Sequence, residues 1–340
     1  MTSVEWGRLR DDRTRPRLAG ILTQGVLSGS SRVQDQDQLE TSDPIQPELR
    51  AIDAYNAREE LVAWLRSFGV TTIHTGHGPG ALVSGQTLIA KTRGDTVEDA
   101  VIEPLHAVAF TLGPTVSSRF DSPGTRAKGV AMIREKLVEA QRYRDDLEGD
   151  DPPDRDLALE VLAGVLAGET PALITAQAST EIMSALRLQR EFGFELLLDG
   201  AAEAYLLLDE IRDSGAPVIL HPTMMRARGE TRNVSMETAA KLAEAGIPFA
   251  LQSGYESYVP KTRVVLFEAA IAAANGLGFD RALAAVTIDA ARILGIDDRV
   301  GSLEVGKDAD IVLFDGDPFE YTSHVCRVVI DGRSVSEECH

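Results

Sequence analysis

Short apolar segments alternate with alanine-rich segments of helical period along most of this chain, and this alternation restricts the fold more than any other feature. The candidate strands are residues 21–27, 70–75, 106–111, 172–176, 194–199, 217–221 and 247–252. Two intervening segments show clear helix signals. Residues 180–189 are amphipathic and are followed by Gly193, and residues 236–245 lie between Ser235, the expected N-cap, and Gly246. Strands that alternate with helices are typical of a parallel α/β fold.

Seven candidate strands are one fewer than a closed (β/α)8 barrel requires. Residues 112–155 interrupt the alternation with glycine, proline and acidic residues, and we expect the eighth strand in this region. The acidic run at 148–154 is expected to be a solvated linker, and the polar residues 28–50 a long loop. Further helices are expected over residues 260–277 and 281–294.

The pattern changes to tight turns and short alternating strands after residue 296. Residues 301–315 and 325–333 predict antiparallel strands, with Lys307 and Asp308 at one hairpin tip and Asp331-Gly332 as a two-residue hairpin turn. The predicted domains are therefore an N-terminal extension (1–19), a barrel (20–296) and a small β module (297–340).

Composition excludes several classes of partner. The chain has 340 residues with 53 acidic and 34 basic side chains, a formal charge of −19, and this acidity argues against binding to nucleic acid or to an anionic membrane. Hydrophobic residues make up 44%, too many for a disordered chain, and no apolar run is long enough for a membrane span. The cysteines, Cys326 and Cys339, are interpreted as unpaired thiols, and we expect a cytoplasmic, soluble protein.

The C-terminal region resembles the amidohydrolase superfamily, particularly its imidazolonepropionase-like branch. The resemblance rests on the strings TIDAARILG (287–295), GSLEVGKDADIV (301–312) and DGDP (315–318), with weaker similarity at GVTT (69–72), SGQT (84–87), GAAEAY (200–205) and HPT (221–223). It implies an α/β fold, a distorted (β/α)8 TIM-type barrel with a small, incomplete β-sandwich side domain. The sandwich is expected to be incomplete because only about twenty residues precede the first strand, and its open edge suggests an oligomer.

The resemblance also implies hydrolysis of C–N bonds with zinc or another divalent metal, yet the usual ligands are missing. The first strand contains no histidine, Gln177 stands at the fifth-strand site, Asp199-Gly200 at the sixth, and the eighth ends in Gln252-Ser253 without an aspartate. Amide side chains do not replace imidazole or carboxylate as zinc ligands. No residue is therefore assigned as a metal ligand, and the cofactor is left open.

The remaining candidate site residues lie at predicted strand ends or in the loops that follow them. We assign catalytic roles to Asp199, His221 and Glu256, and substrate binding to His74, His77, Gln177 and Tyr255. Each assignment has a structural alternative. His74 and His77 can be incidental imidazoles in a glycine-rich loop, and Asp199 can cap the following helix. Lys91 and Arg93 are expected to be a solvated surface pair, with an anchor for an anionic substrate as the alternative.

Two functions follow from this pattern. The first is a divergent amidohydrolase-like hydrolase acting on a non-peptide C–N bond of a small molecule. The second is a non-catalytic homologue that serves as a partner subunit or a ligand binder. The expected partners are a small-molecule substrate and further protein subunits, in a homo-oligomer or in a hetero-oligomer with an intact relative.

Overall fold

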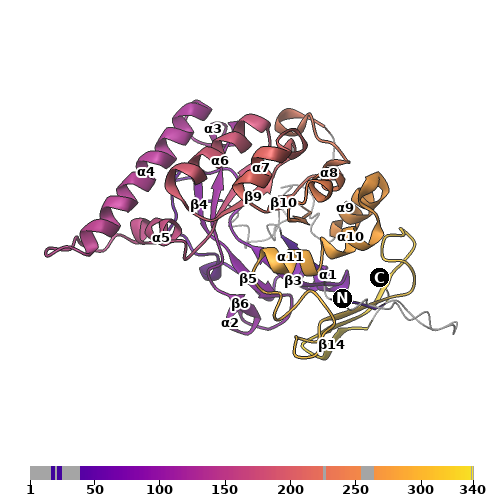
Figure 1. The fold of residues 1–340 in the computed structure, drawn as a ribbon. Helices are drawn as coiled ribbons and strands as arrows, with labels where there is room; N and C mark the ends of the chain where they lie inside the picture. Colours follow the sequence, from indigo (N-terminus) through magenta and orange to yellow (C-terminus); the bar gives the residue numbers. More distant parts are fainter. Residues whose placement is uncertain are drawn as a thin grey trace.

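A six-stranded sheet with the order β11-β10-β9-β8-β7-β4 organises the structure, which is a computed structural model (Figure 1). The structure describes residues 17–19 and 21–24 by their backbone, and residues 39–224, 227–253, 264–337 and 339. The strands of this sheet are β4 (Val83–Gln86), β7 (Val108–Thr111), β8 (Ala172–Ala176), β9 (Leu196–Gly200), β10 (Val218–Leu220) and β11 (Phe249–Leu251). All are parallel except β4, which pairs antiparallel with β7.

The register of the parallel strands determines which side chains meet. Thr111 of β7 pairs with Thr175 of β8, Thr175 with Asp199 of β9, and Asp199 with Ile219 of β10. Paired residues in neighbouring parallel strands point to the same face. Three polar side chains therefore line up in one row near the carboxyl ends of the strands.

A second sheet, ordered β2-β3-β5-β6, holds the remaining barrel-like strands. Its strands are β2 (Ile21–Gln24), β3 (Val70–Thr75), β5 (Leu88–Lys91) and β6 (Val101–Glu103). All seven strands expected from the sequence are present, within a few residues of their predicted bounds. Among the described residues, however, no ladder joins the two sheets, so the strands form two open sheets instead of the expected closed barrel.

Helices connect the strands and cover the six-stranded sheet (Figure 1). The α-helices are α1 (Glu60–Ser67), α2 (Val97–Ala100), α3 (Pro114–Ser117), α4 (Arg126–Leu147), α5 (Leu157–Leu166), α6 (Ser179–Phe192), α7 (Leu208–Ser214), α8 (Thr238–Glu244), α9 (Val265–Ala272), α10 (Phe279–Ala284) and α11 (Ile288–Ile293). The short η elements are η1 (Ala51–Asp53), η2 (Ala204–Leu206), η3 (Gly229–Thr231) and the π-helical η5 (Ala273–Leu277).

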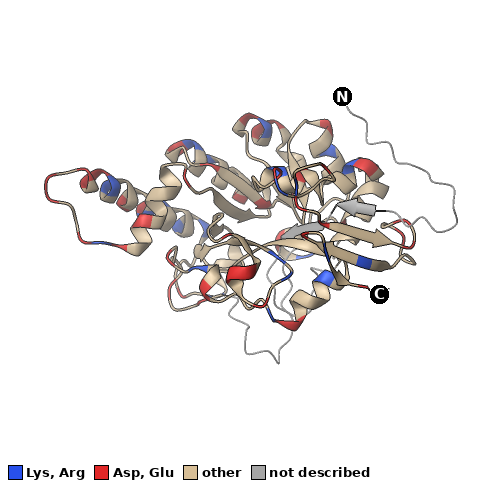
Figure 2. Ribbon diagram, turned by 90° about the horizontal axis from the view of Figure 1, so that it is seen from below, with Lys and Arg blue, Asp and Glu red and all other residues tan. Residues whose placement is uncertain are grey.

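Several helix predictions are confirmed and others are corrected. Helix α6 ends at Gly193 in the left-handed conformation, as expected. Helix α8 begins at Thr238, because Ser235 forms a turn before the helix and does not cap it. The predicted eighth strand within 112–155 is wrong, since α3 and the long α4 occupy this region. The acidic run that follows α4 is the exposed loop at the left of Figure 2.

The two ends of the chain meet in a third sheet, ordered β1-β12-β13-β14. Its strands are β1 (Arg17–Ala19), β12 (Ile311–Phe314), β13 (Val325–Ile330) and β14 (Arg333–Ser336). The Asp331-Gly332 hairpin is confirmed, and both residues have positive φ as its turn type requires. The predicted hairpin tip at Lys307-Asp308 is wrong, because residues 301–310 form turns without a strand. The N-terminal extension thus contributes a strand, and the described residues contain no opposing sheet to complete a sandwich.

Lys91 and Arg93 connect the second sheet to this third sheet, which corrects their predicted surface location. Lys91 is 2% exposed, and its ammonium lies 2.6 Å from Asp310, 3.1 Å from Asp308 and 3.4 Å from Asp331. Arg93 also pairs with Asp331. Asp308 and Asp310, which belong to the string at 301–312, therefore form ion pairs with a buried lysine of β5.

Apolar side chains fill both faces of the six-stranded sheet. Ile174 and Leu198 belong to the core between the sheet and its outer helices. Leu173, Leu197 and Ile219 pack on the opposite face against residues of α11. Near the carboxyl ends this second face carries Thr175 and Asp199, so the polar row lies above an apolar floor.

Two further observations concern the chain as a whole. Cys326 and Cys339 form a disulfide, so the interpretation as unpaired thiols is wrong. In the part of the chain that the structure describes, no helix is long and apolar enough to cross a membrane. The cytoplasmic location stays a prediction, and the disulfide removes the support that unpaired thiols would have given it.

Candidate active site

A cavity of about 520 Å³ lies at the carboxyl ends of the central strands. The expected residues His74, His77, Gln177, Asp199 and His221 all line it. Tyr255 and Glu256 lie outside the described residues. The cavity wall also includes groups for which the sequence gave no functional prediction: Thr111, Thr115, Thr175, Arg228, Glu230 and Thr231.

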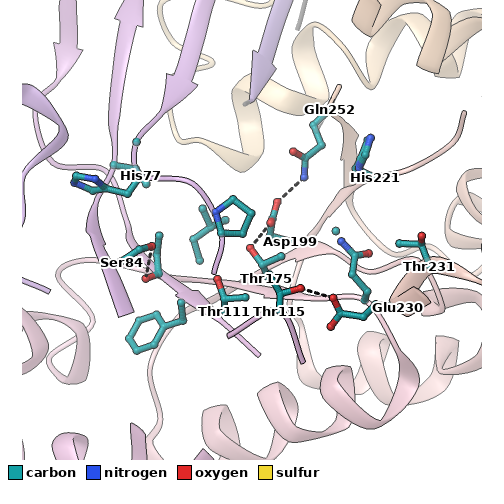
Figure 3. A pocket seen from close by; sticks show the side chains of 18 of the residues that line it. His77, Ser84, Thr111, Thr115, Thr175, Asp199, His221, Glu230, Thr231 and Gln252 are labelled. Atoms are coloured by element: carbon teal, nitrogen blue, oxygen red, sulfur yellow. Dashed lines mark hydrogen bonds between the residues drawn. The ribbon is translucent and has the colours of Figure 1, made fainter. Parts of the chain in front are cut away.

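Asp199 is the buried carboxylate of the cavity. The Thr175 hydroxyl donates to Asp199 Oδ2 at 2.5 Å, and the Gln252 amide donates to Asp199 Oδ1 at 2.5 Å (Figure 3). Burial raises the pKa of Asp199 above its ordinary value, while these two hydrogen bonds act in the opposite direction. The next helical element, η2, begins after Glu203, so the helix-capping alternative for Asp199 is wrong. Its side chain is held inside the cavity by neighbouring strands.

His221 follows β10 and lies close to a second buried carboxylate. Its Nε2 is 3.8 Å from Oε1 of Glu268, a fully buried residue of α9. The other oxygen, Glu268 Oε2, accepts from the backbone N–H groups of Thr223 and Met224 and from the Thr223 hydroxyl. Glu268 therefore holds the loop that carries His221, and its negative charge stabilises the imidazolium that forms when His221 takes a proton.

Gln177 places an amide donor against the backbone at the end of β9. Its Oε1 accepts from the Ala202 N–H at 3.2 Å, which assigns Nε2 as the donor end. Nε2 lies over Gly200, where any Cβ would collide with it. No described residue accepts a hydrogen bond from this Nε2 group, so its N–H groups can serve a ligand in the cavity.

His74 lies in a buried chain of imidazoles below the cavity. Its Nε2 is 2.7 Å from Thr87 Oγ1 and 3.2 Å from His106 Nδ1, and His106 Nε2 is 3.1 Å from the Leu294 carbonyl. Burial lowers the pKa of His106 to about 4 and that of His74 well below its ordinary value, so both are neutral at pH 7. The Leu294 carbonyl requires a proton on His106 Nε2, which leaves His106 Nδ1 to accept from His74 Nε2–H.

His77 lies apart from this pair. Figure 3 shows it near Ser84, on the far side of the drawn cavity from His221. The binding roles of His74 and His77 stay predictions.

Several polar groups of the site were missed in the sequence, and three of them show why. Glu230 lies in an irregular loop without periodicity, and Thr115 follows a Gly-Pro turn that was expected near a strand. Glu268 belongs to an alanine-rich helix, where a single acidic residue normally faces solvent. The full burial of Glu268 is what indicates a role in the site, and burial cannot be seen in a single sequence.

The described side chains do not fit the divalent metal that the resemblance implies. Thr175, Gln177, Gly200 and Gln252 surround Asp199, and both Asp199 oxygens accept hydrogen bonds from neutral donors. In the part of the chain that the structure describes, no group of three His, Cys, Asp or Glu side chains could hold a metal ion. The chemistry is therefore derived from the side chains alone.

Comparison with known proteins shows what this chain is similar to. Residues 262–335 match the Amidohydrolase family. An amidohydrolase structure from Thermotoga maritima superposes with a TM-score of 0.89 at 28% identity, covering 95% of this chain and 87% of that one. These matches support an amidohydrolase-like chain.

Within this superfamily the chain is imidazolonepropionase-like. It is 28% identical over 133 residues to an imidazolonepropionase of Thermoplasma volcanium and 30% identical over 134 residues to one of Fusobacterium nucleatum. Each match covers 38% of this chain and 32% of the relative. The matched region thus spans about a third of the length of these relatives, and the predicted resemblance is confirmed.

Proposed function

We propose that this chain is a hydrolase for a non-peptide C–N bond of a small molecule and that its own side chains perform the proton transfers. The observation that carries this proposal is the His221–Glu268 pair, which opens onto the same cavity as Asp199 and Gln177. A histidine supported by a buried carboxylate is a common arrangement for a general base. The names of the matched relatives favour a cyclic amide such as an imidazolone.

In the proposed reaction, His221 takes a proton from water as the water oxygen attacks the substrate carbonyl carbon. Glu268 stabilises the resulting imidazolium. The Gln177 amide donates a hydrogen bond to the carbonyl oxygen, where negative charge develops. Asp199, fixed by Thr175 and Gln252, accepts a hydrogen bond from a substrate N–H group. We also propose that the two open sheets belong to one distorted (β/α)8 barrel.

A ligand binder without turnover is the second candidate. It is favoured by the lack of a metal-binding group among the described residues, because the superfamily resemblance implies metal-assisted hydrolysis. The two candidates share one cavity and differ in whether water attacks the bound molecule.

A substrate panel separates the two candidates. The panel contains cyclic amides, imidazolones, ureas and linear amides, each incubated with chelator-treated protein and with protein supplied with zinc or manganese. Mass spectrometry detects addition of water, and thermal shift detects binding. Hydrolysis without added metal supports the proposal. Thermal stabilisation by panel members without any water addition supports the binder and contradicts the hydrolase.

A further inference from the structure

Glu230 is an acidic group of the cavity that the proposed reaction does not yet use. It lies in η3, in the loop that follows β10, and its carboxylate lines the same cavity as His221 and Asp199. The Thr115 hydroxyl of α3 donates to Glu230 Oε2 (Figure 3). The carboxyl group is therefore half-buried and held in one position at the cavity wall.

A second carboxylate approaches Glu230 across Gly113. A Cβ built at Gly113 would collide with Glu230 Oε1 and would lie 3.0 Å from Glu181 Oε1. The absence of a side chain at Gly113, whose φ is +116°, allows the two carboxyl groups to come together. Glu181 is 2% exposed and comes from the first turn of α6.

The surroundings of the two carboxyl groups differ. Glu181 Oε2 accepts from the N–H groups of Gln177 at 3.3 Å and Ala178 at 3.0 Å, and Glu181 Oε1 accepts from Arg126 at 3.0 Å. Glu230 accepts from the hydroxyl and the backbone of Thr115, a neutral residue. When two carboxyl groups share a site, hydrogen bonds and a paired cation favour the ionised form of one, and the proton resides on the partner with fewer and weaker donors. Glu230 is that partner.

The charged groups around Glu230 also favour a proton on Glu230 over one on Glu181. Burial and the charge of Glu181 raise the pKa of Glu230, while the Thr115 hydrogen bond and the charge of Arg126 lower it, and the net shift is upward. Arg228 lies two residues earlier in the same loop and also lines the cavity. Glu230 thus combines a raised pKa with direct access to the cavity.

We propose that Glu230 is the general acid that protonates the leaving nitrogen. This inference rests on the proposed hydrolase function and assigns its second proton transfer. After water has added and His221 holds the water proton, the C–N bond breaks and its electron pair remains on nitrogen. Nitrogen takes the proton of Glu230, which leaves a carboxylic acid product, a neutral amine and an ionised Glu230. Solvent then reprotonates Glu230, and His221 releases its proton.

An ester and an anilide with the same acyl group test this assignment, because they differ in their need for a leaving-group proton. The probes are 4-nitrophenyl acetate and 4-nitroacetanilide. Nitrophenolate leaves without protonation, whereas the anilide nitrogen requires a proton. We expect Glu230→Gln to lower kcat for the anilide by roughly 100-fold or more, the usual range for loss of general acid catalysis, and to leave ester hydrolysis within about threefold.

Two further variants separate a catalytic role from a structural one. Glu230→Asp keeps a carboxylic acid and should recover part of the anilide activity. Glu237→Gln, an exposed change outside the cavity, should leave both activities unchanged. Equal loss for ester and anilide in Glu230→Gln, or no loss for either, would overturn the assignment while the hydrolase function stands. If the wild-type chain hydrolyses neither probe nor any panel compound, the proposed function itself fails.

The pH profile provides an independent readout. Anilide hydrolysis requires protonated Glu230, so its rate should fall as the pH rises through the pKa of this group. Arg126 lies outside the cavity lining, and its charge lowers that pKa. Arg126→Gln should therefore move the basic limb of the anilide profile to higher pH and leave the ester profile in place. If the basic limb of the anilide profile does not move in this variant, or if the anilide and ester profiles shift together, the proposed role of Glu230 is contradicted.

Discussion

At the scale of single residues, the site depends on neutral donors around buried carboxylates. Asp199 receives the Thr175 hydroxyl and the Gln252 amide, and both contacts follow from strand register and strand ends. These donors replace the cationic surroundings that usually keep a buried carboxylate ionised. Their removal should change the protonation of Asp199 more than its position.

Thr175→Val tests this dependence. The substitution removes a hydrogen bond that lowers the pKa of Asp199, so that pKa should rise further. A hydrogen bond to a charged group contributes about 1.5–3 kcal/mol. We expect the acid limb of kcat/KM to move to higher pH. Thr175→Ser keeps the hydroxyl and should leave the limb unchanged; equal profiles for both variants would show that this bond does not control Asp199.

The positions of some cavity residues could be predicted from the sequence because they lie at strand ends, while their catalytic and binding roles stay predictions. Asp199 and His221 follow apolar runs, and Gln177 follows β8, so their convergence could be predicted from the parallel fold. Glu230, Thr115 and Glu268 could not be predicted in this way. They reach the cavity from a loop, a four-residue helix and a buried helix face, and their contacts join segments that are distant in the chain.

At the scale of elements, a strand and a helix both end at a glycine in the left-handed conformation, and only the strand end allows a close approach. Gly200 ends β9 with φ of +80° and lies under the Gln177 amide. Gly193 ends α6 with a similar φ of +77°, but the space around its Cβ position is open. The two glycines therefore share a backbone conformation and differ in what a side chain would displace.

Alanine substitution at both positions separates backbone strain from displacement of Gln177. Each variant should lose about 1–2 kcal/mol of unfolding free energy, the cost of a left-handed alanine. Only Gly200→Ala should also lose hydrolytic activity, because its methyl group moves the Gln177 amide. Denaturant unfolding and kcat on the best panel substrate provide the measurements. Equal activity in the two variants would contradict the role of Gln177.

Element prediction failed where strands are short and interrupted. β4 contains Gly85, and β4, β5 and β6 are only three or four residues long. They therefore lack the extended apolar run by which a strand is predicted from sequence. The missing eighth strand was expected in a region that contains the 22-residue α4, whose mixed charged sequence gave a weak periodic signal. Helix α8 begins two residues later than predicted, because Ser235 lies in a turn that precedes the helix.

At the scale of the whole molecule, a buried ion network ties the C-terminal sheet to the rest of the fold. Lys91 is 2% exposed and meets three aspartates of the C-terminal region. Lys91→Met leaves the buried Asp310 without its cation and should cost about 3–5 kcal/mol. Arg292→Met removes an exposed pair with Asp289 and should cost about 0–1 kcal/mol. Similar unfolding free energies for both variants would show that the network does not stabilise the fold.

The buried imidazoles should make the stability of the whole molecule depend on pH. The pKa of His106 falls from 6.5 to about 4 on folding, so the unfolded chain binds more protons between these values. This contribution to stability is complete above pH 6.5 and is lost as the pH falls toward 4. We expect a lower Tm at about pH 5 than at about pH 7.5, and a smaller difference in His106→Gln. An unchanged difference in this variant would exclude His106 as the source.

Figure 2 shows acidic and basic residues interspersed over the helices. The net charge of −19 therefore argues against some classes of partner but does not locate a binding site. The function therefore depends on the cavity, where we propose that His221 and its neighbours hydrolyse a C–N bond without a resident metal. The most direct measurement is the hydrolysis rate of chelator-treated wild-type and His221→Asn proteins on the best panel substrate. We predict that wild-type turnover survives chelation and that His221→Asn loses roughly 100-fold or more. Turnover that requires added zinc or manganese, or that persists in His221→Asn, would contradict the account.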